Sequence, residues 1–218
     1  MKIANVKVYG MNESIIASAL PKCADVNNSN DGSLLAVDDL KRAKILGSAE
    51  SGSGHDCYLK GIIVQFDLTA PEHFFRQIDR YHFIDYISSQ SKMHKINKIN
   101  LKELCSDRVS NKVIDMLEHM IDIYNKPVIL AEDISFISNE YGIKYNTQCS
   151  DYKKELFQMI IDNVPSGLEL TARMTTNYLQ LKSILKQRRN HKMETWQHFY
   201  NWIEELPLFK ELTKMGVK

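Results

Sequence analysis

The sequence predicts a fold of the α/β (α+β) class, with strands near the amino end followed mainly by helices. Apolar residues alternate with polar ones in two early segments, and later segments carry apolar residues at helical spacing. The content of 44% hydrophobic and 25% charged residues is typical of a globular chain. A chain of 218 residues buries enough surface to fold without a disulfide or a metal. Because no repeat or linker divides it, we expect a single domain over residues 1–218.

Two segments have the pattern of β-strands. Residues 2–9 place Ile3, Val6 and Val8 among polar side chains and end at Gly10. Residues 62–68 alternate apolar and polar side chains with a period of two. The second segment should therefore be a strand with one buried face.

Helices are predicted where the apolar spacing changes to three and four residues. A turn-forming cluster at 27–33 precedes the first, at 34–46. Thr69-Ala70-Pro71-Glu72 has the form of a capping box, so a second helix should start there. Further helices are predicted over residues 106–124, 151–162, 177–189 and 193–206.

The balance of 28 basic and 27 acidic residues argues against a nucleic-acid partner, which requires clustered basic excess. The four cysteines lie too far apart for a metal-binding pattern, so we expect free thiols and no metal. Residues 1–20 lack the apolar core of a signal peptide, and no run approaches the roughly 20 apolar residues that cross a bilayer. We therefore expect a cytoplasmic protein without a membrane partner.

The candidate site is centred on His55 and on the polar residues that follow the second strand. Gln77, Arg80 and Asp85 lie within about two helical turns, so an amide, a guanidinium and a carboxylate could line one side of a pocket. The alternative is a solvated helix face without a function. His82 taken alone is more often a structural histidine.

Residues 54–91 contain Gly54-His55, a predicted strand, Ala70-Pro71, Arg76-Gln77 and a serine-rich end. They resemble the core of the flavin-dependent thymidylate synthases, which show G-H, a strand, A-P, R-Q and a signature R-H-R-x-x-S leading to a serine loop. A second block resembles that family's L-P, L, T, N, L, L and R at similar spacing. Its residues are Val164-Pro165, Leu168, Thr175, Asn177, Leu181, Leu185 and Arg188.

The resemblance implies a central mixed sheet flanked by helices, assembled as a homotetramer. It also implies an enzyme, a flavin-dependent methyltransferase of the thymidylate synthase type. In that family FAD binds across the subunits and NADPH reduces it. Methylenetetrahydrofolate donates the one-carbon unit, and dUMP becomes dTMP. The expected small-molecule partner is therefore a dUMP-like nucleotide.

The resemblance implies a cofactor-binding role for His55, Arg80, His82 and Asn177. Gln77 and Arg80 would also contact the nucleotide.

It further implies that Ser91 contacts the nucleotide phosphate. Lys92, beside Ser91, is a further candidate substrate-binding residue, because a lysine can replace an arginine as a point charge. Arg188 would bind the substrate and act as the catalytic residue, because a guanidinium against the pyrimidine edge stabilises negative charge that develops there. The alternative for Arg188 is an exposed cation near a helix end.

The chain also departs from the family pattern. Arg80 is followed by Tyr-His-Phe-Ile-Asp instead of H-R-x-x-S, and Met93 and Ile161 stand where the family has phosphate-binding arginines. A basic stretch at 92–98 could replace the lost charge, or it could be a solvated face. Three hypotheses follow: a dUMP-methylating flavoenzyme, a diverged member that acts on another nucleotide or pyrimidine-like substrate, and a non-catalytic oligomeric binding protein.

Overall fold

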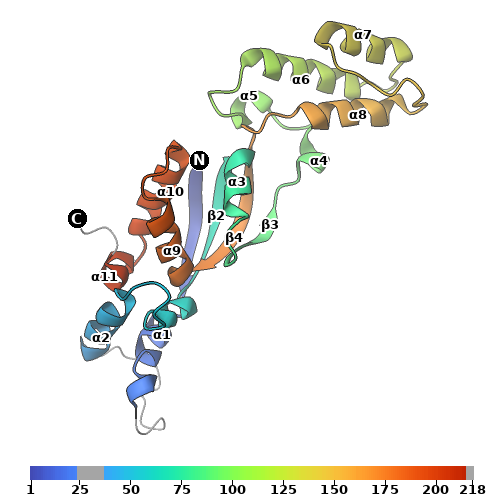
Figure 1. The fold of residues 1–218 in the computed structure, drawn as a ribbon. Helices are drawn as coiled ribbons and strands as arrows, with labels where there is room; N and C mark the ends of the chain where they lie inside the picture. The colour runs from blue at the N-terminus through green and yellow to red at the C-terminus, as the bar shows by residue number, and fades with distance from the viewer. Residues whose placement is uncertain (24–36, 215–218) are drawn as a thin grey trace. The chain divides into compact units, whose positions relative to one another are not determined.

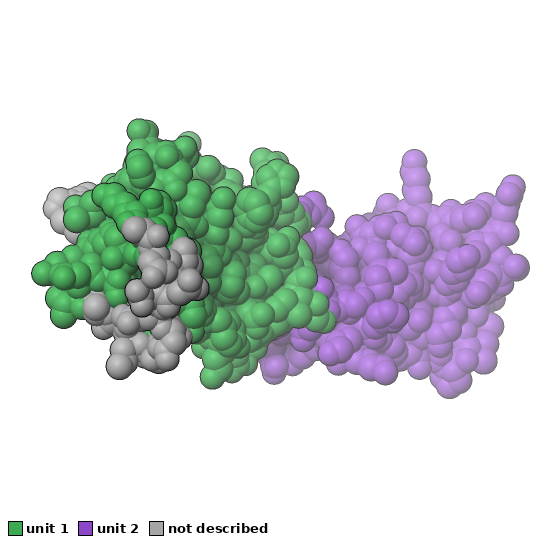
Figure 2. Space-filling view, turned by 90° about the horizontal axis from the view of Figure 1, so that it is seen from below, with its two compact units in different colours: residues 1–68, 77–88, 172–218 green, residues 69–76, 89–171 purple. Residues whose placement is uncertain are grey.

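The structure is a computed structural model that describes residues 1–23 and 37–214. The turn cluster predicted at 27–33 lies outside the described residues. The chain divides into two compact units (Figure 2). Unit 1 contains residues 1–68, 77–88 and 172–218, and unit 2 contains residues 69–76 and 89–171. The single domain expected over residues 1–218 stays a prediction.

The described strands β1 (Lys2–Tyr9), β2 (Ile63–Pro71), β3 (Ile84–Ser89) and β4 (Glu169–Asn177) form one sheet in the order β1-β2-β4-β3 (Figure 1). All neighbouring strands are antiparallel, so the sheet is not the mixed sheet that the resemblance implied. The two predicted strands correspond to β1 and β2, whereas β3 and β4 were not predicted. A central sheet with flanking helices confirms the predicted α/β class.

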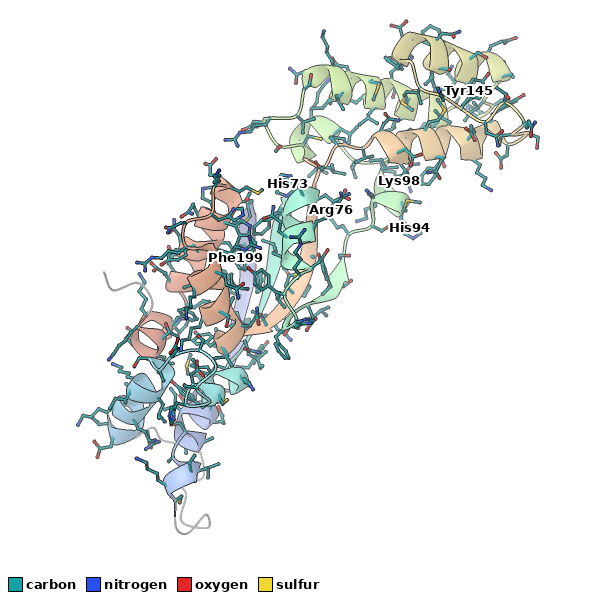
Figure 3. The ribbon with its side chains drawn as sticks, viewed as in Figure 1. His73, Arg76, His94, Lys98, Tyr145 and Phe199 are labelled. Atoms are coloured by element: carbon teal, nitrogen blue, oxygen red, sulfur yellow. The ribbon has the colours of Figure 1, made fainter. Side chains whose placement is uncertain are left out.

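The alternation predicted for β2 is present, with Val64, Phe66 and Leu68 completely buried. Phe66 packs against two rings of α10 (Glu194–Glu204), with centroid distances of 6.2 Å to Phe199 and 4.5 Å to Trp202. Figure 3 labels Phe199 on this helix. The buried face of β2 in unit 1 is therefore covered by α10.

The remaining helices of unit 1 include two of the predicted ones. The helix predicted at 177–189 is α9 (Tyr178–Arg188), and the one predicted at 34–46 is α2, whose described part begins at Val37. The other elements are α1 (Met11–Ala17), η1 (Leu20–Lys22), α2 (Val37–Gly47), η3 (Cys57–Gly61) and α11 (Phe209–Thr213). α3 (Glu72–Ile78) begins in unit 2 and ends in unit 1.

Unit 2 is mainly helical and has its own core. Its helices are α4 (Lys92–Lys95), α5 (Leu101–Leu104), α6 (Asn111–Tyr124), α7 (Ala131–Tyr141) and α8 (Tyr152–Asn163). Leu117, Ile137 and Ile160, from α6, α7 and α8, are completely buried in one cluster. The helix predicted at 151–162 is α8, and Asp151 caps it by accepting from Lys154 N at 3.0 Å. α7 was not predicted.

Two predicted helix starts are wrong. The strand β2 continues through Pro71, and Thr69 hydrogen-bonds across the sheet with Thr171 at 2.8 Å instead of capping a helix. α6 begins at Asn111 instead of residue 106, because Ser106 N–H donates to Gly167 O at 2.9 Å and so pairs with another segment. In both places a contact distant in sequence replaces the expected local one.

No helix in the described ranges is both long enough and apolar enough to cross a membrane.

Candidate functional site

Unit 1 contains a cavity of about 340 Å³ between the turn after α3 and one side of α9. Its lining residues are Arg80, Tyr81, His82, Phe83, Gln180, Ser183, Gln187 and Arg188. Three of these, Arg80, His82 and Arg188, are site residues that the sequence predicts. The volume is at the lower end of the range for small-molecule sites.

The sequence of α9 explains how it presents one polar side to this cavity. Asn177 is the N-cap, and its side-chain oxygen accepts from Gln180 N at 2.9 Å. Gln180, Ser183 and Gln187 then recur at spacings of three and four, so they share a face. The buried residues of the helix include Leu181, Ile184 and Leu185.

The turn that carries the other half of the lining is held at both ends. Tyr81 N–H donates to Ile78 O at 2.8 Å, where α3 ends. Thr176 of β4 donates its hydroxyl to Phe83 O at 2.7 Å. These bonds attach the turn to elements of unit 1, so they hold in place the backbone that carries Arg80 and His82.

The lining carries positive charge and hydrogen-bond donors. Arg80 and Arg188 contribute guanidinium groups, and His82 contributes an imidazole. Within the part of the chain that the structure describes, no carboxylate lines the cavity. This composition favours a ligand that carries negative charge or several acceptor atoms.

Arg188 also affects a nearby histidine. Burial, and then the charge of Arg188, lower the pKa of His191 below its ordinary value of 6.5. The Nδ1 atom of His191 accepts a hydrogen bond from Met193 N at 3.2 Å, which requires that nitrogen to be unprotonated. The neutral imidazole is therefore the form that fits this environment.

Gln77, predicted to bind the nucleotide, is not among the residues that line the cavity. Its Oε1 accepts from Trp196 Nε1 at 2.7 Å, and its Nε2 donates to Met193 Sδ at 2.9 Å. Asp85 lies on β3 and Arg80 in a turn, so the prediction that Gln77, Arg80 and Asp85 share one helix is wrong. The physical reason is that α3 ends at Ile78, before Arg80 is reached.

His55, predicted to face the flavin, is exposed in the loop between α2 and η3. The residue after it, Asp56, is buried and forms an ion pair with Lys182 of α9 at 2.7 Å, with side chains 2% and 4% exposed. Lys182 Nζ also donates to Gly47 O at 2.9 Å and to Ala49 O at 2.6 Å. The ammonium group of Lys182 therefore ties α9 to the loop that carries His55, with contacts before and after that residue.

Ser91 and Lys92, the predicted substrate-binding residues at the end of the first block and directly after it, belong to unit 2. Ser91 precedes α4 and makes no capping hydrogen bond with its side chain. Lys92 Nζ lies 3.0 Å from a carboxylate oxygen of Glu72, whose other oxygen pairs with Arg76 at 3.0 Å. Burial alone would raise the pKa of Glu72, but the hydrogen bonds from Lys92 and Arg76 lower it overall.

The other basic residues of the stretch at 92–98 are exposed. Figure 3 labels His94 and Lys98 at α4 and just after it, and Lys95 ends that helix. Figure 3 also labels Arg76, which lies in the part of α3 that belongs to unit 2. Only Lys92 of this stretch is neutralised by a carboxylate within the described residues.

Sequence reasoning did not identify Tyr81, Phe83, Gln180, Ser183 and Gln187 as lining residues. The polar spacing along α9 was a usable signal for three of them, because residues three and four apart share a helix face. No signal of this kind exists for Tyr81. Its partner Arg188 lies 107 positions away in the sequence.

No protein-family model matches the sequence, and no curated protein sequence matches it. Among solved structures, the chain is similar to flavin-dependent thymidylate synthase ThyX from Helicobacter pylori complexed with FAD and dUMP, with a TM-score of 0.63 and 14% identity over 100% of both chains. A second structure of thymidylate synthase X from the same organism, also with FAD and dUMP, gives a TM-score of 0.61 and 13% identity over 97% of this chain and 96% of that one. The chain therefore has the fold of the flavin-dependent thymidylate synthases.

Proposed function

We propose that this protein is a flavin-dependent thymidylate synthase-like enzyme that binds FAD and methylates dUMP to dTMP. The observation that carries the proposal is the meeting of Arg80, His82 and Arg188 at one cavity of unit 1. These residues were selected from the sequence through two blocks on either side of a long helical segment. Two solved structures with the same fold, from Helicobacter pylori, are complexes with FAD and dUMP.

The cavity suits such ligands in its charge. FAD and dUMP carry phosphates and have rings with several acceptor atoms, and the lining offers guanidinium, amide and hydroxyl donors without a carboxylate among the described residues. Arg80, His82, His55 and Asn177 are the residues we assign to the cofactor, and Ser91 and Lys92, with Arg80 and Arg188, to the nucleotide. Gln77 is not assigned a nucleotide contact, because its amide is bonded to Trp196 and Met193. Bound FAD would supply the hydride chemistry of the reaction.

Arg188 has the central chemical role in this proposal. A guanidinium carries a permanent charge, so it stabilises negative charge that develops on a pyrimidine ring without first having to gain a proton. Gln180 and Ser183, at the same cavity, can bind and orient the ligand through hydrogen bonds. NADPH and methylenetetrahydrofolate are the co-substrates we expect, in a homotetramer located in the cytoplasm.

A second candidate function, methyl transfer to another pyrimidine-like substrate, is favoured by a specific observation. Lys92, which stands near the expected phosphate-binding position, is paired with Glu72 at 3.0 Å. A substrate phosphate would have to compete with the carboxylate of Glu72 for the ammonium group of Lys92. Met93 and Ile161 also supply no charge where the family has arginines. A substrate with a smaller anionic group would depend less on these positions.

The test is dUMP-dependent oxidation of NADPH in the presence of methylenetetrahydrofolate, with dTMP measured as product. We expect turnover by the full chain, and we expect Arg188→Gln to lower kcat by about 10²-fold to 10³-fold, as removal of a charge-stabilising donor does. Arg189→Gln is the matched control, because Arg189 is exposed and does not line the cavity.

A protein that retains flavin but forms no dTMP would contradict dUMP methylation and favour the second candidate function. A colourless protein that FAD does not reconstitute would contradict both candidates and support a non-catalytic binding protein. Equal losses in Arg188→Gln and Arg189→Gln would contradict the role assigned to Arg188.

A further inference from the structure

The guanidinium of Arg188 lies against two aromatic rings. Its central carbon is 4.9 Å from the centroid of Trp196 and 5.6 Å from that of Tyr81. The two rings meet edge to face, with centroids 6.0 Å apart and an interplanar angle of 68°. Both distances to the guanidinium are within the range of cation–π attraction. The cation is thus held by the faces of two aromatic side chains.

A hydrogen bond adds direction to this arrangement. Arg188 Nε donates to the hydroxyl oxygen of Tyr81 at 2.7 Å. Because Nε is the only guanidinium nitrogen on the side of the aliphatic stem, this bond fixes the plane of the group. Within the described residues, neither terminal nitrogen of Arg188 has a hydrogen-bond partner. Those two nitrogens form the parallel donor pair that binds two neighbouring acceptors.

The ring of Trp196 is itself fixed. Trp196 is 1% exposed, and its Nε1 donates to Gln77 Oε1 at 2.7 Å. Gln77 in turn donates to Met193 Sδ. A chain of contacts therefore runs from Gln77 through Trp196 to Arg188, and it gives Gln77 a supporting position behind the cavity.

We propose that Tyr81 and Trp196 are positioning residues that hold Arg188 with its terminal nitrogens available to a ligand in the cavity. Tyr81 then sets the affinity for a ligand group that presents two adjacent acceptor atoms, although the phenol itself does not contact that group. The inference rests on the proposed function, since it takes Arg188 as the residue that meets the ligand. It is specific to this chain, which has a tyrosine directly after Arg80.

The decisive experiment is a double-mutant cycle on the affinity for dUMP, measured by calorimetry with the full chain loaded with FAD. Tyr81→Phe keeps the ring and removes the acceptor, and Arg188→Lys keeps the charge and removes the fork. We expect about tenfold weaker binding in Tyr81→Phe, the effect of one hydrogen bond to a charged group. We expect no further weakening when Tyr81→Phe is added to Arg188→Lys, because the phenol acts only through the guanidinium.

Tyr86→Phe is the matched control. It also removes a phenol hydroxyl from unit 1, one that donates to Asp79 at 2.7 Å, and Tyr86 does not line the cavity. Its dUMP affinity should equal that of the wild type. An unchanged affinity in Tyr81→Phe, or an equal loss in the presence and absence of Arg188→Lys, would overturn the proposal.

A second readout does not depend on any ligand. In a ¹⁵N NMR spectrum the Nε–H of Arg188 should exchange slowly with water, and this protection should disappear in Tyr81→Phe while the circular dichroism spectrum is unchanged. Protection of the Arg188 Nε–H without dUMP binding would contradict the proposed function but would support the positioning role of Tyr81. Binding of dUMP to a protein whose Arg188 Nε–H is unprotected would overturn the positioning role of Tyr81 and leave the proposed function standing.

Discussion

At the scale of single residues, the cavity depends on how the guanidinium of Arg188 is held. Arg188 lines the cavity together with Arg80 and His82, and its guanidinium lies against the rings of Tyr81 and Trp196. The environment of Arg188 was not predictable, because Tyr81 and Trp196 come together with it only after the chain has folded. The place of Gln77 in the sequence blocks predicts a contact with the ligand. In the structure its amide is instead bonded to Trp196 and Met193.

A prediction at this scale concerns the protonation of His191. Burial and then Arg188 lower its pKa below 6.5, so the folded state favours the neutral form. The unfolded chain binds the proton more readily, and the resulting contribution to stability is present above pH 6.5 and decreases as the pH falls through the folded pKa. An NMR titration of the His191 ring should give a midpoint below 6.5.

The same titration checks the position of Arg188. In Arg188→Gln the midpoint of His191 should rise but remain below 6.5, because burial is the larger cause and persists. The Arg189→Gln variant should leave the midpoint where it is in the wild type. An unchanged midpoint in Arg188→Gln would mean that the guanidinium does not act on His191.

At the scale of elements, the periodicity of apolar residues predicted which helices and strands exist better than it predicted where they begin and end. β1, β2, α8 and α9 follow the predicted ranges closely. β4 was missed because its buried residues are Ala172, Met174 and Thr176, which do not make a conspicuous apolar alternation. The capping box predicted at Thr69 was wrong because β2 continues through this residue and its hydroxyl bonds to Thr171 of the neighbouring strand. Such competition between distant and local partners is not visible in one sequence.

The ion pair between Lys182 and Asp56 joins α9 to the loop of His55 across 126 positions of sequence. Lys182→Met leaves the Asp56 carboxylate buried without its partner and removes the donor of two backbone carbonyls. We expect the free energy of unfolding to fall by about 3–5 kcal/mol, as in other buried pairs that lose one member. Denaturant unfolding of the full chain measures this change.

The control for that variant is Lys186→Met, one helical turn further along α9. Lys186 has a side chain 61% exposed and lies 4.0 Å from an exposed carboxylate of Glu50. Its replacement should change stability by less than about 1 kcal/mol, as exposed pairs do. Similar losses in the two variants would contradict the anchoring role of Lys182.

At the scale of the whole molecule, the fold is that of the flavin-dependent thymidylate synthases, at 14% identity over 100% of both chains. A fold survives such divergence because packing depends on the size and polarity of side chains more than on their identity. Function depends on particular groups at particular points, and the same fold can host more than one activity. For this reason the proposed function depends on the cavity residues and not on the overall similarity.

The most direct test of the central claim is a titration of dUMP into the full chain loaded with FAD, followed by the absorbance spectrum of the flavin. The account predicts a yellow protein whose flavin spectrum changes with dUMP to saturation, and it predicts a much weaker response in Arg188→Gln and in Arg80→Gln but not in Arg189→Gln. A protein that takes up no flavin, or a dUMP response that is the same in all three variants as in the wild type, would contradict it.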